Sequence, residues 1–212
     1  MKYLRDRSIA KSLLDVASLS NPGPWIQHSI NVGRAAEIIA TELSKNETDV
    51  DPENAYICGM LHDIGRYVGS TPSVVHSWDG YQYLERLGYE GTAQTCVTHS
   101  FPVTDTSCIN GWGKIPEDVQ NGLRHLLDDF KWTIYDKIIA LCDTLADSRG
   151  FSTIEKRIVS AAIRNGIHSN SPKLWKRYYE IKSEVEDVIG KSIYRLLPGI
   201  EDSLYHSIAL EN

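Results

Sequence analysis

The chain has 212 residues, 42% hydrophobic and 24% charged, and its 22 basic and 28 acidic residues give a net charge of −6. These values are ordinary for a globular domain, and the acidic balance argues against a broad surface for nucleic acid. No apolar run approaches the roughly 20 residues that span a bilayer, and charges occupy the N-terminus where a signal peptide would be apolar. We therefore expect a cytoplasmic protein that binds neither membranes nor nucleic acid. The four cysteines show no close pairing, which excludes a disulfide framework and a zinc finger.

The opening segment predicts a helix, because apolar residues recur there every four positions: Ile9, Leu13 and Ala17. A breaker at 21–24 separates it from a second predicted helix, from about Trp25 to Leu43. The inward stripe of this helix includes His28 and is otherwise apolar: Val32, Ala35, Ile39 and Leu43. The stripe predicts that the His28 imidazole points toward the core.

A third helix should begin at Pro52, where Asp51 can cap it, and stop near Gly65. Its residues are apolar on nearly every side, which is typical of a central helix. His62 and Asp63 lie at its end. Because burying an unpartnered carboxylate costs several kcal/mol, the pair indicates a cation or a hydrogen-bonding network, unless both side chains reach water.

The rest of the chain also predicts helices, and no strand pattern of useful length is present, so the fold class is all-α. The expected elements are helices at 77–87, 92–99, 116–130 and 134–148, a loop at 101–114, and two or three helices after Thr153. In the 134–148 helix the apolar stripe is Ile134, Ile138, Leu141 and Leu145. Periodicity alone therefore assigns Asp136, Asp143 and Asp147 to a solvated face.

Three separated motifs of the chain resemble the signature of the HD-domain phosphohydrolases. They are His28, the pair His62-Asp63 within the run 61–66, and Asp143 within the run 140–147. The resemblance covers roughly residues 24 to 150. It implies an HD-domain helical bundle that holds a divalent metal through His28, His62, Asp63 and Asp143. Only the resemblance selects Asp143, and Asp147 is the alternative carboxylate. On this basis we expect residues 1–150 to form the core with the metal site and residues 151–212 to add helices that pack on the same domain.

Some HD-domain subfamilies have two further histidines, which bind a second metal bridged to the first by the Asp of the pair. His76 and His99 match that order. Their alternative role is in capping or phosphate contacts. The remaining histidines are expected on the surface: His125, His168 and His206.

Imidazoles and carboxylates without thiolates favour iron or manganese, with zinc, cobalt or nickel as alternatives, and one or two ions per chain. Such a metal makes hydroxide available near neutral pH, and this hydroxide would attack phosphorus. Asp63 and His62 are therefore the predicted catalytic residues together with Arg66, which would bind the substrate phosphate; Arg149 and Lys114 are weaker candidates. The resemblance implies a phosphohydrolase whose substrate is a nucleotide or another small phosphorylated metabolite.

Two other functions stay open. A minority of HD-domain proteins with two metals are mixed-valent di-iron oxygenases, and the ligand order does not separate them from hydrolases. A non-catalytic ligand-sensing or scaffold module that keeps a metal for stability is the third reading. A group of large side chains near the C-terminus is expected to pack on the bundle or on a second subunit of a homodimer: Trp175, Tyr178, Tyr179 and Ile181.

Overall fold

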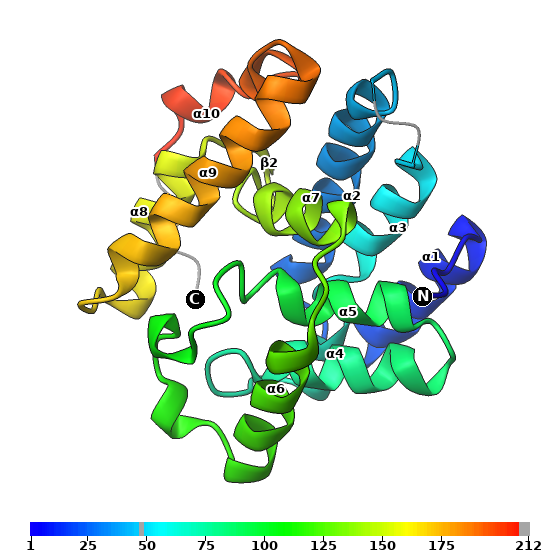
Figure 1. The fold of residues 1–212 in the computed structure, drawn as a ribbon, viewed down its shortest axis with the longest axis vertical. Helices are drawn as coiled ribbons and strands as arrows, with labels where there is room; N and C mark the ends of the chain where they lie inside the picture. The colour runs from blue at the N-terminus through cyan, green and yellow to red at the C-terminus, as the bar shows by residue number, and fades with distance from the viewer. Residues whose placement is uncertain (47–48, 208–212) are drawn as a thin grey trace.

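The computed structural model describes residues 1–46 and 49–207 (Figure 1). The regular secondary structure of its described part is helical, as predicted, apart from one small pair of strands. The elements are α1 (Arg7–Ser20), α2 (Pro24–Leu43), α3 (Pro52–Leu61), α4 (Val75–Arg86), α5 (Glu90–Thr98), α6 (Glu117–Asp129), α7 (Ile134–Asp143), β1 (Ala146–Asp147), β2 (Gly150–Phe151), α8 (Ile154–Asn165), α9 (Ser171–Ile189) and α10 (Asp202–Tyr205). Short 3₁₀ turns occur at Ile64–Val68, Thr106–Cys108, Trp112–Lys114 and Ile193–Arg195.

Helices α2 and α3 cross at two glycines. A Cβ added to Gly59 would lie 2.8 Å from the Cα of Gly33. The two backbones therefore approach more closely than any residue with a side chain would allow. The start of α3 is as predicted, since Asp51 accepts a 2.9 Å hydrogen bond from the Glu53 amide. This close crossing brings His28 of α2 near the C-terminal end of α3.

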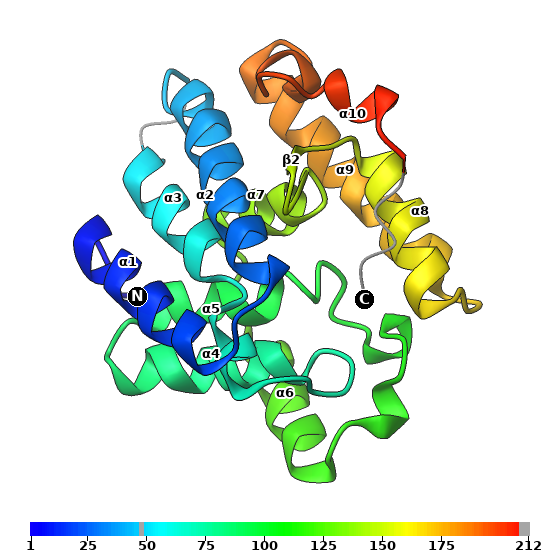
Figure 2. The same cartoon turned by 180° about the vertical axis from the view of Figure 1, so that it is seen from behind.

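Three hydrophobic clusters meet around these helices. The first joins α2 and α7 to α9, which contributes Tyr178, Ile181 and Val185. The second packs α1 and α3 against α4 and α5, and the third lies between α5, the 101–115 segment and α6. Helices α8, α9 and α10 lie together on one side of the molecule in both views (Figures 1 and 2). Within the described residues no helix combines the length and apolarity that crossing a membrane requires.

The prediction of one helix over 134–148 is wrong at its C-terminal end. Helix α7 ends at Asp143, where the Thr144 hydroxyl donates to the Leu141 carbonyl oxygen at 2.7 Å. The chain then forms an antiparallel hairpin in which Ala146 pairs with Phe151, a turn that places Gly150 at φ 146°. The strands are two residues long, too short for an alternating pattern to reveal them.

Two smaller expectations also fail. Of the stripe predicted for α1, Ala17 is buried and Leu13 packs on the second cluster, whereas Ile9 is 42% exposed and Ala10 and Leu14 are buried instead. Helix α3 ends at Leu61 rather than near Gly65, because the chain tightens into the 3₁₀ turn at Ile64–Val68. His62 and Asp63 therefore occupy the junction between the two helical segments.

Candidate metal centre

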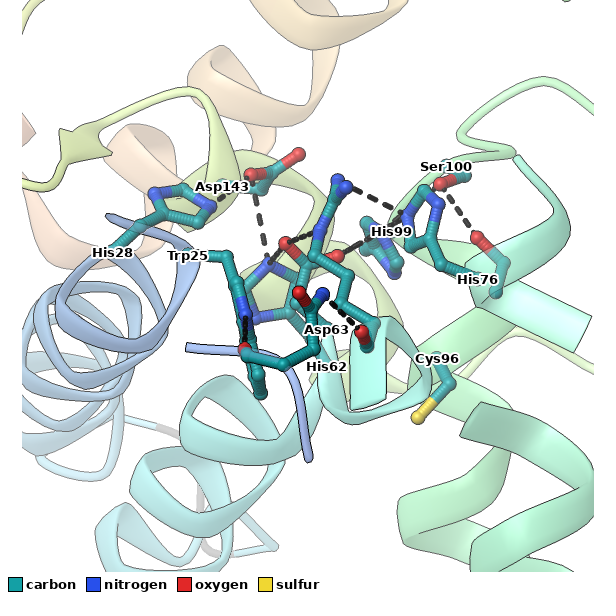
Figure 3. A network of polar contacts seen from close by, with 12 residues as sticks. Trp25, His28, His62, Asp63, His76, Cys96, His99, Ser100 and Asp143 are labelled. Carbon is teal, nitrogen blue, oxygen red and sulfur yellow. Dashed lines mark hydrogen bonds and ion pairs between the residues drawn. The ribbon is translucent and has the colours of Figure 1, made fainter. Parts of the chain in front are cut away.

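Six imidazoles and carboxylates from several segments of the chain converge in one place (Figure 3). Each lies at or close to a helix end, apart from His28, which projects from the second turn of α2. The other five are His62 and Asp63 after α3, His76 at the start of α4, His99 at the end of α5 and Asp143 at the end of α7. All the residues that the sequence suggested as metal ligands are thus brought together.

Asp63 lies between the two halves of this group. Its Oδ1 is 3.1 Å from His76 Nε2 and 3.6 Å from His99 Nε2. Its Oδ2 accepts a 2.5 Å hydrogen bond from Arg66 Nε and lies 3.8 Å from His62 Nε2. The carboxylate is 3% exposed, so its negative charge must be balanced locally.

The other half contains His28, His62 and Asp143. Asp143 Oδ1 lies 2.9 Å from His28 Nε2 and 3.6 Å from His62 Nε2. Three groups of ligand atoms in the centre have all members within 4.8 Å of one another: His28 with His62 and Asp63, His62 with His99 and Asp143, and Asp63 with His76 and His99. Figure 3 shows His28 and Asp143 on one side of Asp63, and His76 and His99 on the other.

Backbone carbonyls fix the orientation of two imidazoles. His62 Nδ1 lies 2.7 Å from the Gly59 carbonyl oxygen, and His99 Nδ1 lies 3.2 Å from that of Thr95. A carbonyl can only accept, so in both rings Nδ1 donates a proton and Nε2 directs its lone pair into the centre. This arrangement is typical of histidines that bind metals.

The residues present fit a divalent cation. Within the described part of the chain, His62 Nε2 and Asp63 Oδ1 are buried without a hydrogen bond of acceptable geometry. Donor atoms that share one ion through bonds of about 2.0–2.2 Å are themselves roughly 3–4 Å apart, the spacing seen around Asp63. A cation would satisfy both buried atoms at once.

The charge states suit a cation as well. Burial raises the pKa of Asp63, but Arg66 and His62 outweigh it and hold that pKa well below its ordinary value. The same balance, with hydrogen bonds from His28 and His62, lowers the pKa of Asp143. Burial lowers the pKa of His99 to about 3. The centre therefore holds two ionised carboxylates and a neutral His99 near pH 7, which are ligating forms.

The pKa values of the remaining imidazoles shift in different directions. Burial also lowers the pKa values of His28 and His76. Burial acts the same way on His62, but Asp63 and Asp143 outweigh it and raise its pKa. Of the four imidazoles in the centre, His62 is thus the one whose pKa is raised.

The basic candidates have different environments. Arg66 is 40% exposed while its Nε bonds to Asp63, so the guanidinium connects the centre to solvent. Arg149 pairs with Asp147 at 3.2 Å and donates to the Ser207 carbonyl oxygen, and Lys114 is exposed in its 3₁₀ turn. Asp147, the alternative carboxylate, belongs to none of the ligand groups found in the described residues.

Several residues depart from the sequence expectations. Asp136 is fully buried rather than solvated, and His168 is half-buried with its Nε2 donating to the Cys108 carbonyl oxygen. His125 and His206 are exposed, as predicted. Sequence reasoning also did not anticipate Arg157, whose charge adds to burial in lowering the pKa of His28.

Comparison with known proteins agrees with this geometry. The family model described as HD domain matches residues 25–147, more than half of the chain. Neither a curated protein nor a solved structure matches the chain. HD domains are commonly metal-dependent phosphohydrolases, so a hydrolase-type function that uses a metal is suggested. The chain belongs to the HD-domain family.

Proposed function

We propose that the protein is a metal-dependent phosphohydrolase that acts on a nucleotide or another small phosphorylated metabolite. The observation that carries the proposal is the position of Asp63, whose two oxygens face different imidazoles. A carboxylate so placed is suited to bridge two ions, one held with His28, His62 and Asp143 and the other with His76 and His99. Iron and manganese fit this ligand set best, and one or two ions per chain are consistent with it.

A divalent cation here would neutralise phosphoryl oxygens and make a water acidic enough to act as a nucleophile near neutral pH. The protein's own groups prepare the site for that chemistry. Gly59 and Thr95 hold the rings of His62 and His99 in the orientation that ligation requires. Burial of the ligands keeps bulk water from competing with them for the metal.

Arg66 is the first candidate for contact with substrate. Its Nε is engaged by Asp63, which fixes the guanidinium, and its Nη2 lies 3.5 Å from His76 Nε2. The exposed remainder of the guanidinium can donate to a phosphate that enters from solvent. Arg66 would thus serve both to hold Asp63 and to bind the phosphate of the substrate.

The test begins with elemental analysis of protein purified without chelators, followed by phosphate release from a panel of phosphate esters. We expect one or two metal atoms per chain and release of phosphate that stops when a chelator removes the metal. His62→Ala and Asp63→Ala should each lose both metal and turnover while the chain still folds, as judged by circular dichroism. Unchanged turnover in either variant contradicts the assignment.

The same preparation separates the two other readings. Oxygen consumption that depends strictly on iron and an organic substrate, without phosphate release, would identify an oxygenase. A metal-loaded protein that binds nucleotides tightly and turns none over would be a sensing module. Hydrolysis is preferred because the site combines its buried ligands with an arginine that reaches solvent.

A further inference from the structure

Two serine hydroxyls form a chain of hydrogen bonds that ends at the metal centre. Ser77, in the first turn of α4, is fully buried, and its hydroxyl donates a 2.8 Å hydrogen bond to the hydroxyl of Ser100. Ser100 Oγ in turn lies 3.0 Å from His99 Nε2. Figure 3 shows Ser100 beside His76 and His99. Neither serine is one of the six candidate ligands, so this chain of hydroxyls calls for a role of its own.

The orientation of His99 fixes the direction of these hydrogen bonds. Its Nδ1 donates to the Thr95 carbonyl oxygen, so its Nε2 carries a lone pair and can only accept. Ser100 is therefore the donor to His99 Nε2, and its oxygen accepts from Ser77. His76 Nε2 also approaches His99 Nε2, but at the longer distance of 3.4 Å. The two serines thus direct a hydroxyl proton into the centre.

This proton needs another acceptor when the centre holds a cation. A cation bound to His99 takes the Nε2 lone pair, which then cannot accept from a hydroxyl. The hydroxyl of Ser77 still donates to the oxygen of Ser100 and so keeps the proton of Ser100 on the side of the centre. Ser100 is half-buried, whereas Ser77 is fully buried, so a molecule that enters from solvent can reach the outer of the two hydroxyls.

The surroundings of Ser100 indicate the chemistry of that acceptor. Arg66 Nη2 lies 3.5 Å from His76 Nε2, which is itself 3.4 Å from His99 Nε2. The guanidinium of Arg66 and the hydroxyl of Ser100 therefore approach the same pair of imidazoles, and the Arg66 side chain is 40% exposed. A phosphate has several oxygens and can accept from both donors at once, whereas a water on a cation has one lone pair left. Two converging donors thus fit a phosphate.

We propose that Ser100 is a substrate-binding residue, whose hydroxyl donates to a phosphoryl oxygen on the side of the centre formed by His76 and His99. Ser77 is the positioning residue that orients this hydroxyl. The inference rests on the proposed function, because it takes the phosphate of the substrate to lie at the metal centre. Recognition of that phosphate is then divided between a charged donor, Arg66, and a neutral one, Ser100.

The test measures binding of inorganic phosphate to the metal-loaded full chain by isothermal titration calorimetry, and metal affinity by chelator competition. Ser100→Ala removes the donor, and Ser100→Thr keeps it. Ser44→Ala is the matched control, since Ser44 is also half-buried and donates one hydrogen bond, to the Thr41 carbonyl oxygen. Thermal melting reports whether each variant is folded. Ser100→Cys, which keeps the shape but donates only weakly, replaces the alanine variant if that variant unfolds.

We expect phosphate affinity to fall at least about ten-fold in Ser100→Ala, because a hydrogen bond to a charged group is lost. Ser100→Thr should restore it to within about three-fold, and Ser44→Ala should leave it unchanged. Ser77→Ala should weaken phosphate binding by a smaller factor, about three-fold, because the Ser100 hydroxyl remains but is no longer oriented. Metal affinity should stay within about three-fold in Ser100→Ala, since the hydroxyl is not a ligand.

Equal phosphate affinity in the Ser100→Ala and Ser44→Ala proteins would overturn the inference. A ten-fold loss of metal affinity in Ser100→Ala would overturn it as well, because Ser100 would then serve to hold His99. The absence of phosphate binding by the unmodified protein would have the same meaning.

Binding of phosphate requires no turnover, which keeps this inference separate from the proposed function. A phosphate affinity that depends on Ser100, in a loaded protein that hydrolyses no ester, would support the role of Ser100 while the hydrolase proposal fails. Ester hydrolysis together with a phosphate affinity that is insensitive to Ser100→Ala would support the hydrolase and contradict the role of Ser100.

Discussion

The hydroxyl of Thr98, the residue before His99, donates a 2.7 Å hydrogen bond to the carboxylate of Asp136. Gln94 Nε2 donates to the other carboxylate oxygen at 2.7 Å, and the Thr133 amide and hydroxyl donate to that oxygen as well. Asp136 therefore ties α5 to the start of α7. Since His99 directly follows α5 and α7 ends at Asp143, this contact helps to hold two of the candidate ligands at a fixed separation.

Replacing Asp136 should destabilise the protein substantially. Asp136→Ala removes an acceptor that Thr98, Gln94 and Thr133 share, and leaves Thr98 and Gln94 only their longer 3.2 Å bonds to backbone carbonyl oxygens. At about 1–3 kcal/mol for a lost buried hydrogen bond, we expect the free energy of unfolding to fall by about 3 kcal/mol. Urea unfolding of the chelated protein measures this without any contribution from metal. Asp128→Ala, at an exposed position of α6, is the control and should change stability by less than about 0.5 kcal/mol.

Asp136 also illustrates what the sequence could and could not predict. The 3.6-residue pattern identified the helices and the inward stripe of α2, because those helices have one apolar and one polar face. Helix α7 contacts α2, α3, α5 and α9, and a helix that is surrounded has no solvated face for the pattern to detect. Periodicity therefore placed Asp136 and Asp143 in solvent, although Asp136 is fully buried and the side chain of Asp143 is only 25% exposed.

The candidate ligands came from two different kinds of information. The apolar stripe was sufficient to predict that His28 points inward. The position of His62 and Asp63 at the end of an apolar helix was sufficient to predict that they are buried. Asp143 depended on the resemblance to a known family.

Asp143 and Asp147 should respond differently to the loss of charge. Asp143→Asn removes a carboxylate that faces His28 and His62, so we expect metal affinity to fall at least about ten-fold. Asp147→Asn removes only the partner of Arg149, an ion pair worth about 1 kcal/mol or less, and should leave metal affinity unchanged. Chelator competition on both variants measures the two affinities; the reverse ranking would show that Asp147 is the ligand.

Gly65 is expected to be intolerant of any side chain. A Cβ at this position would lie 2.0 Å from the His76 carbonyl oxygen and 2.4 Å from the Gly80 amide nitrogen, and neither backbone atom can yield without moving α4. Gly65→Ala should therefore cost at least about 2 kcal/mol in unfolding free energy and weaken metal binding, because α4 carries His76. Gly113→Ala has nothing within 4 Å of the added Cβ and is the matched control. Equal melting temperatures of the two variants would argue against this packing.

The chelated protein should become less stable as the pH is lowered from about 6.5. Burial depresses the pKa of His99 from 6.5 to about 3, and the pKa values of His28 and His76 also lie below 6.5. Below pH 6.5 the unfolded chain takes up protons on these rings while the folded protein does not, so folding loses the corresponding free energy. His62 has a raised pKa, so its contribution is present below pH 6.5 and is lost as the pH rises through its folded-state pKa.

Each depressed histidine should add about 1.4 kcal/mol per pH unit to this dependence in the window between its folded and unfolded pKa values. Urea unfolding at pH 7, 6, 5 and 4 gives the slope, and His99→Gln should reduce it by about one such increment because the group no longer titrates. His125→Gln, at an exposed position of α6, should leave the slope unchanged. Bound metal prevents protonation of its ligands, so the loaded protein should lose its ion rather than unfold gradually over the same range. A slope identical in the His99 and His125 variants would mean that His99 is protonated in the folded protein, and it would remove the neutral imidazole on which ligation at that position depends.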